Sequence, residues 1–338
     1  MLGSYCLPPL FVYVMLQTFS DTLIELYDAA ENVEINAFPA EVIRLVGGLV
    51  GFDGAVLGMG ESLAPNPHNL LIHNALVHGR DPGILSDYAK VSATDPMTSK
   101  FMAGLAEPLA SSLFNIEPGK HMDELRAFYK SHELQHLLLF GEVGDDQNPA
   151  RWLVLYRGTG DAFDMQASQH LAAVWPHIAR CLSISRSHFL RGQFGQHQHK
   201  GVALIGSSGC IEVAEPLFRQ LCALEWPAGI GRNIPEAVSN SWRRGRDYVG
   251  TRVKLTMQLK HDDFIVSQAC AIGPLEQLTP AERSVANRFA TGLSAKAVAN
   301  ALGISVHTVR SQLGHVYEKL NIHDKAGLAS YLLANSDR

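Results

Sequence analysis

The residues best suited to chemistry on a nucleic acid lie between Ser305 and Leu320. Hydrogen-bond donors recur along this segment at helical spacing, so a helix would gather them on one face: His307, Arg310, Ser311, Gln312, His315 and Lys319. An arginine can donate two parallel hydrogen bonds to O6 and N7 of guanine, and other polar side chains can bind phosphate oxygens. The pattern predicts a face that binds double-stranded DNA; the alternative is an ordinary solvated helix surface.

The same segment carries an apolar stripe that would position this face. Its members are spaced by three, four, three and four residues, as in a helix that buries one side: Val306, Val309, Leu313, Val316 and Leu320. Ser305 can cap this helix, and Ser294 can cap a shorter one that ends at Gly303. Upstream, Thr279–Glu282 has the order of a capping box with proline at the first helical position. Together these features predict a helix-turn-helix unit.

Over about 55 residues from Leu278, the segment resembles the LuxR-type (GerE-like) DNA-binding domain. The matching landmarks are Leu278–Glu282, Gly292–Ser294, Ala299, Leu302–Ser305, Thr308–Arg310 and Lys319–Leu320. The resemblance implies an all-α, four-helix domain over residues 275–338, whose third helix enters the major groove. It implies base contact by Arg310 with Ser311 beside it. The phosphate contacts that it implies are Lys296, Thr308, Gln312, His315 and Lys319.

Three positions depart from that family pattern. Ala297 stands where relatives often carry glutamate, which removes a capping-box partner of Ser294. Gly314 stands where relatives often carry a second base-contacting side chain, which implies relaxed sequence readout, and glycine inside a helix costs about 1 kcal/mol relative to alanine. Asn321 replaces the frequent glycine after the third helix, but asparagine tolerates a left-handed backbone. The last segment, 324–334, corresponds to the helix that forms the dimer contact in this family. We therefore expect a homodimer.

Upstream of this domain, helical and strand patterns alternate. Helices are expected where apolar residues recur at helical spacing: 19–30, 39–50, 164–194 with a kink at Pro176, and 216–224. Strands are expected at short apolar runs near turn-forming residues: 55–59, 136–143, 152–156, 202–205, 211–214, 251–259 and 263–271. Residues 144–149 suit the loop of an antiparallel hairpin. Residues 192–200, which include His197 and His199, have the composition of a linker.

Two sensor-like units follow from these patterns. Residues 15–194 resemble the GAF-like and autoinducer-like domains found ahead of LuxR-type domains, and residues 201–272 resemble a degenerate PAS domain. In acyl-homoserine-lactone receptors an Asp-Pro pair supplies a ligand-binding aspartate, which makes Asp95 and Tyr88 the candidate ligand-binding residues here. The family's tryptophan is missing, and Asp95-Pro96 is alternatively a plain turn. The expected fold is multidomain: α/β sensor domains of GAF/PAS-like type, then the four-helix domain.

Charge and cysteine content fit this division. The net charge of the whole chain is −5. From Leu275 onward there are seven Lys or Arg and five Asp or Glu, which gives this part a charge of +2 and the part before it a charge of −7. Five cysteines without close spacing argue against a zinc site or a disulfide scaffold, and fit buried thiols in a reducing cytoplasm. The apolar run 7–16 is too short to span a membrane and lacks a preceding basic residue, so neither signal peptide nor membrane anchor is expected. Met1 or Met15 could start translation.

The sequence thus predicts a cytoplasmic, sequence-specific transcriptional regulator that responds to a small molecule or a partner protein. Its partners would be double-stranded DNA, a second copy of the chain and RNA polymerase, and no cofactor is expected. Control by phosphorylation, or by haem or flavin in the PAS-like unit, stays an alternative. An enzyme is disfavoured because no phosphate-binding glycine motif, nucleophile elbow or metal-ligand spacing occurs.

Overall fold

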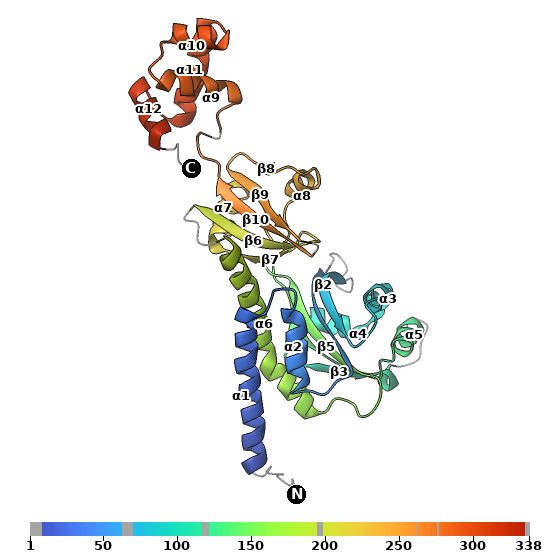
Figure 1. The fold of residues 1–338 in the computed structure, drawn as a ribbon. Helices are drawn as coiled ribbons and strands as arrows, with labels where there is room; N and C mark the ends of the chain where they lie inside the picture. The colour runs from blue at the N-terminus through green and yellow to red at the C-terminus, as the bar shows by residue number, and fades with distance from the viewer. Residues whose placement is uncertain are drawn as a thin grey trace.

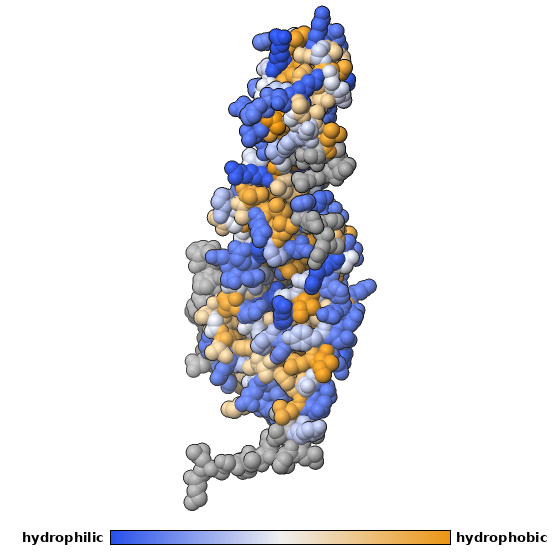
Figure 2. Space-filling model, turned by 90° about the vertical axis from the view of Figure 1, so that its left-hand side faces the viewer, coloured by the Kyte–Doolittle hydropathy of each residue, from blue (hydrophilic) through white to orange (hydrophobic). Residues whose placement is uncertain are grey.

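The chain forms two antiparallel sheets followed by a domain of helices (Figure 1). The computed structural model describes residues 9–62, 70–116, 122–194, 199–261, 263–275 and 277–334. Figure 2 shows an elongated molecule with hydrophilic residues interspersed among smaller hydrophobic patches. Cys6, His197 and the middle of the expected linker lie outside the described residues. Within the described ranges, no helix is both long enough and apolar enough to cross a membrane.

The first unit has three layers, with a sheet between two sets of helices (Figure 1). Its helices are α1 (Pro9–Asn32), α2 (Phe38–Gly47), α3 (Ile84–Val91), α4 (Pro96–Met102), α5 (Asp123–Ser131) and α6 (Met165–Phe194), with 3-10 turns η1 (Ser92–Thr94) and η2 (Leu113–Asn115). Its strands are β1 (Gly54–Ser62), β2 (Leu70–His78), β3 (Leu109–Ser112), β4 (His136–Glu142) and β5 (Ala150–Arg157). The expected α/β class is confirmed, as is the hairpin of β4 and β5.

Side chains alternate across this sheet, so each central strand contributes to two cores. Leu138 and Leu153 pack toward α1, α2 and α6. Their neighbours Leu139 and Trp152 pack toward α3, α4 and α5. The second of these cores contains the cavity described below.

The second unit repeats the strand order of the first. Its elements are β6 (Lys200–Gly206), β7 (Ile211–Ala214), α7 (Pro216–Glu225), α8 (Glu236–Arg243), β8 (Tyr248–Val249), β9 (Val253–Lys260) and β10 (Phe264–Ala271). The two sheets are ordered β2-β1-β5-β4-β3 and β7-β6-β10-β9-β8. Counted from the first strand of each sheet, both orders read 2-1-5-4-3. The four strands expected from sequence in this unit are confirmed.

Helix α6 belongs to the cores of both units. Leu171 and Ile178 pack into the first unit, whereas Leu190 packs against Val202 and Phe264 of the second. At 1.5 Å per residue its 30 residues span about 45 Å. Pro176 lies inside this helix, which continues to Phe194.

The C-terminal domain has its own core. Its helices are α9 (Pro280–Ala290), α10 (Ala295–Leu302), α11 (Val306–Leu320) and α12 (Lys325–Ala334). All buried members of this core lie between Leu275 and Leu328. The domain therefore buries its apolar residues without contributions from the two upstream units.

Candidate DNA-binding face and ligand pocket

Local caps mark the starts of α9, α10 and α11 and the ends of α10 and α11 in the C-terminal domain. The Thr279 hydroxyl accepts a hydrogen bond from the Glu282 N–H at 3.2 Å, and the Glu282 carboxylate accepts one from the Thr279 N–H at 2.8 Å. Ser294 and Ser305 cap α10 and α11 in the same way, through one bond each. Gly303 and Asn321 adopt left-handed backbone at φ 67° and 51°. The caps predicted from sequence are thus confirmed.

Helix α11 separates a buried side from an exposed side. Its buried residues are Val309, Leu313, Val316 and Leu320, the expected stripe. Arg310 and Ser311 are exposed on the other side, and no described residue hydrogen-bonds or pairs with the Arg310 guanidinium. Lys296 on α10 is exposed as well, and Thr308 is half-buried at the start of α11.

Two of the expected phosphate contacts, Lys319 and His315, are partly engaged within the domain, and a third, Gln312, is partly buried. The Lys319 ammonium donates to Glu282 Oε2 at 2.7 Å and to the Gln277 carbonyl at 3.3 Å. His315 Nδ1 lies 3.6 Å from Glu282 Oε1. Gln312 has a buried amide oxygen that no described residue bonds. Lys319 therefore has a structural role, and the phosphate contacts of these three residues stay predictions.

The Glu282 carboxylate is the centre of that arrangement. Burial alone would raise its pKa, but the hydrogen bond from Lys319 and those from Thr279 together lower it below the ordinary 4.5. The charged form is therefore favoured in the folded domain.

A second candidate site is a cavity of about 90 Å³ in the first unit. It lies between the sheet and helices α3, α4 and α5, and its wall is mainly aliphatic and aromatic. The hydrocarbon, thioether and indole side chains of the lining are Val56, Ile72, Ile84, Leu85, Met97, Phe101, Phe128, Leu134, Leu137, Leu139, Trp152 and Val154. The lining residues with hydroxyl or carboxyl groups are Tyr88, Asp95, Thr98, Tyr129 and Tyr156.

The structure brings the two candidate ligand residues together at this cavity. The Tyr88 hydroxyl donates to Asp95 Oδ2 at 2.6 Å and lies 2.5 Å from the Thr98 hydroxyl. The other Asp95 oxygen accepts from the Met97 N–H at 2.8 Å, which caps α4. Burial raises the pKa of Asp95, although both hydrogen bonds oppose that shift. Asp95 therefore begins a helix and also lines the pocket, and ligand contact by either residue stays a prediction.

Sequence reasoning missed the most distinctive group of this pocket, the hydroxyl of Tyr156. The residue is 1% exposed, and its hydroxyl has no hydrogen-bond partner among the described residues. Tyr129, also missed, donates weakly to the Met97 sulfur at 3.6 Å. The sequence gives no sign that Tyr156 lines a pocket, because the pattern of β5 is that of an ordinary buried strand.

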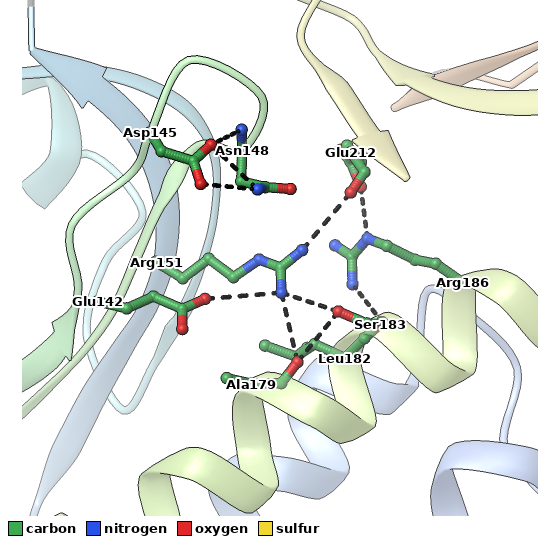
Figure 3. Close-up of polar contacts among 9 residues, drawn as sticks. All are labelled: Glu142, Asp145, Asn148, Arg151, Ala179, Leu182, Ser183, Arg186 and Glu212. Carbon is green, nitrogen blue, oxygen red and sulfur yellow. Dashed lines mark hydrogen bonds and ion pairs between the residues drawn. The ribbon is translucent and has the colours of Figure 1, made fainter. Parts of the chain in front are cut away.

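A polar junction joins the first and second units, and sequence reasoning also missed it (Figure 3). Arg151 on β5 donates to the Ser183 hydroxyl on α6 at 3.0 Å and to the backbone carbonyl of Glu212 on β7 at 3.5 Å. Arg186 on α6 donates to the Glu212 carboxylate at 2.6 Å. The Arg186 and Glu212 side chains are 12% and 4% exposed, so this ion pair is buried.

The junction extends to the far end of β1. Asn233 donates to Glu61 at 3.0 Å, and Arg232 pairs with the same carboxylate at 3.4 Å. Arg219 on α7 reaches the Gln147 side chain in the loop between β4 and β5 at 2.6 Å. These contacts hold the second unit against one end of the first sheet.

The cysteines and potential metal ligands give no further site. Cys181, Cys210 and Cys222 are buried, and burial raises the pKa of these thiols to about 11, 12 and 12, which disfavours a reactive thiolate. Within the described parts of the chain, no group of three or more His, Cys, Asp or Glu could hold a metal ion.

Comparison with known proteins identifies the C-terminal domain. Residues 276–332 match the family described as bacterial regulatory proteins, luxR family. The predicted family resemblance is therefore confirmed for this domain. The comparison with curated protein sequences finds no match.

Solved structures with similarity to the chain include three bacterial proteins. CepR2 of Burkholderia cenocepacia, an N-acylhomoserine-lactone-dependent LuxR-family transcription factor, is 17% identical with a TM-score of 0.35, over 53% of this chain and 99% of that one. SdiA of Escherichia coli is 13% identical with a TM-score of 0.37, over 94% and 98%. The VqsR ligand-binding domain of Pseudomonas aeruginosa is 12% identical with a TM-score of 0.37, over 50% and 97%. Similarity at this level says nothing about a ligand of the present chain.

Proposed function

We propose, on the premise that residues 276–332 form a luxR-family domain, that the chain is a sequence-specific DNA-binding transcriptional regulator. A small molecule bound in the first sensor unit would control how two C-terminal domains engage DNA. Such a regulator would act in the cytoplasm, with RNA polymerase as a further partner. No catalytic role is part of this proposal.

The observation that carries the proposal is the exposed side of α11. Arg310 lies in the second turn of α11, exposed beside the buried Val309, with its guanidinium not engaged by any described residue. A helix held in the major groove by its domain would present this side chain to base edges. Ser311 adjoins it, and the exposed Lys296 is placed to reach the phosphates beside the groove.

Dimerisation is the second part of the proposal, with α12 as the contact. Leu328 packs into the domain core, whereas Ala326 is exposed and Leu333 is 76% exposed. An apolar strip of this kind suits a two-fold contact with the same helix of a second copy. Two recognition helices related by a two-fold axis would bind two half-sites of a palindrome. Sedimentation of wild type and of Leu333→Glu at micromolar concentration, with and without DNA, tests this contact.

The cavity in the first unit supports a small-molecule signal over a bulky cofactor. Pockets for drug-sized ligands typically have volumes of about 300–1,000 Å³, and this cavity of about 90 Å³ is far smaller. Its lining includes Tyr88 and Asp95, the two residues that the sequence suggested as ligand contacts. We therefore place the signal there and leave phosphorylation and haem or flavin control as disfavoured alternatives.

A selection from genomic fragments tests the DNA-binding function. Wild type, Arg310→Ala and Arg288→Ala would be incubated with the fragments at two salt concentrations. Arg288 is an exposed arginine on α9, so its variant makes the same change of charge away from α11. We expect wild type and Arg288→Ala to enrich one shared, roughly palindromic site that Arg310→Ala does not. Failure of the full chain and of residues 273–338 to enrich any site would contradict the proposal.

A further inference from the structure

We propose that the cavity of the first unit takes a compact, neutral and largely apolar molecule whose single hydrogen-bond acceptor is bound by the hydroxyl of Tyr156. The regulatory meaning of this binding rests on the proposed function, but the binding itself does not. The proposal follows from the size of the cavity, from the hydrogen-bond partners of the hydroxyl and carboxyl groups in its wall, and from the charges around it.

The size of the cavity sets the scale of the ligand. An apolar protein cavity of about 150 Å³ admits benzene, and the present cavity measures about 90 Å³. A molecule the size of one five- or six-membered ring can enter with small shifts of the lining side chains. A long acyl chain exceeds this volume.

The hydroxyl and carboxyl groups of the wall, Tyr156 apart, already have partners. Asp95 receives hydrogen bonds on both oxygens, from Tyr88 and from the Met97 N–H. The Thr98 hydroxyl is occupied by Tyr88, and the Tyr129 hydroxyl by the Met97 sulfur. The Tyr156 hydroxyl is buried and has no partner among the described residues.

An unpartnered buried hydroxyl lowers the stability of a folded protein, because it loses its bonds to water and gains none in return. A ligand acceptor in the cavity would replace those bonds. Burial, the main cause, raises the pKa of Tyr156 to about 12. At neutral pH the group therefore keeps its proton and can donate it to a carbonyl, ether or ring-nitrogen acceptor.

The charges near the cavity exclude ionic ligands. The lining contains no Lys, Arg or His, and its one acidic residue is Asp95. An anion would lose its hydration without gaining a counter-charge, which is strongly unfavourable. A cation would have to compete for Asp95, whose oxygens already accept hydrogen bonds. Arg80 lies 5.6 Å from the Tyr156 ring centroid, but its guanidinium donates to the carbonyls of Gly79 and His132.

The test uses the full chain and four probes built on one five-membered ring. Cyclopentanone offers a carbonyl acceptor, methylcyclopentane has none, and cyclopentanecarboxylate and cyclopentylamine carry opposite charges. Affinities would be measured by ligand-observed NMR titration. We expect cyclopentanone to bind and both charged probes to fail. Tyr156→Phe should weaken cyclopentanone binding about tenfold, the usual value of one hydrogen bond, and leave methylcyclopentane unchanged.

Tyr129→Phe provides the matched control. It removes a hydroxyl from the same cavity, but one that is already engaged, so its effect on cyclopentanone should be below twofold. Tyr156→Phe should also raise the melting temperature of the unliganded chain, because it removes the unpartnered hydroxyl. This gain of stability together with a loss of affinity would not follow from a purely structural role.

Several outcomes would overturn the proposal. They are equal losses for cyclopentanone and methylcyclopentane in Tyr156→Phe, tighter binding of the carboxylate than of the ketone, and no ketone binding at millimolar concentration. Tighter binding of N-octanoyl homoserine lactone than of any ring probe would overturn the compact size. None of these results bears on the genomic selection with Arg310→Ala, so the two proposals fail separately.

Discussion

The Nζ atom of Lys319 lies 2.7 Å from Oε2 of Glu282, and this contact ties the end of α11 to the start of α9. The same carboxylate accepts the Thr279 N–H in the capping box. One buried acidic side chain therefore contacts both the first turn of α9 and the last turn of α11.

The charge of Glu282 should make the stability of residues 273–338 depend on pH. Because its pKa is lowered in the folded domain, its stabilising contribution is present above the ordinary 4.5 and is lost as pH falls through the lower folded value. We expect Glu282→Gln to lower the free energy of unfolding by about 1 kcal/mol at pH 7, since a Lys–carboxylate hydrogen bond is replaced by a neutral one. Urea denaturation at several pH values measures both effects.

The free energies of unfolding of wild type and Glu282→Gln should become equal at a pH low enough to protonate the Glu282 carboxylate. Glu318→Gln is the control, because Glu318 is exposed on α11. A constant gap between wild type and Glu282→Gln down to pH 2 would show that the charge is not responsible.

Arg310 and Lys296 should affect DNA binding in different ways. Arg310→Ala is expected to cost about 1–3 kcal/mol at the selected site and to relax the preference for one base pair. Lys296→Ala should weaken binding to all sequences alike and reduce the slope of log affinity against log salt by about one. Gel-shift titrations on the selected site and on single-base variants, at several salt concentrations, distinguish these effects. Uniform weakening by Arg310→Ala would place this side chain on the phosphates instead.

Gly314 and Gly303 should respond oppositely to replacement by alanine. Gly314 is exposed within α11, and a Cβ there would meet no atom within 4 Å. Gly314→Ala should therefore raise the free energy of unfolding by about 0.5–1 kcal/mol. Gly303 has a φ of +67°, so Gly303→Ala should lower it by about 1–2 kcal/mol. Thermal unfolding of residues 273–338 compares the pair, and a destabilising Gly314→Ala would contradict the observed free space.

The Arg186–Glu212 pair should contribute to stability only as a pair. Arg186→Met leaves a buried carboxylate without its partner and should cost about 3–5 kcal/mol. The double variant Arg186→Met, Glu212→Gln should recover most of that loss, because no uncompensated charge remains. Urea denaturation of the full chain gives the coupling energy. Additive losses in the double variant would mean that the two side chains act independently.

The C-terminal domain was predictable because its signals are local. Ser305 caps the helix that it precedes, and the spacing of Val309 and Leu313 alone assigns the buried side of α11. The packing between helices could not be predicted from such local signals. The pairing of Lys319 with Glu282 depends on how α9 crosses α11, so the sequence pattern presented Lys319 only as a surface cation.

Residues 70–131 were the part of the fold that the sequence did not predict. Helices α3 and α5 are short, and Gly83 and Met122 at their N-terminal ends provide no side-chain cap. The pocket was hidden for a related reason: Tyr88 lies on α3 and Tyr156 on β5, far apart in the chain. Only the sheet order brings them to one cavity.

The sharing of α6 between two cores has a consequence for how the first two units unfold. The covalent boundary near residue 195 is not an energetic boundary, because cutting there would expose Leu190 on one fragment and Val202 with Phe264 on the other. The two units should melt in a single cooperative transition, and amides in β5 and β10 should show similar protection from hydrogen exchange. A different second unit in place of this one would therefore need to pack against the C-terminal end of α6.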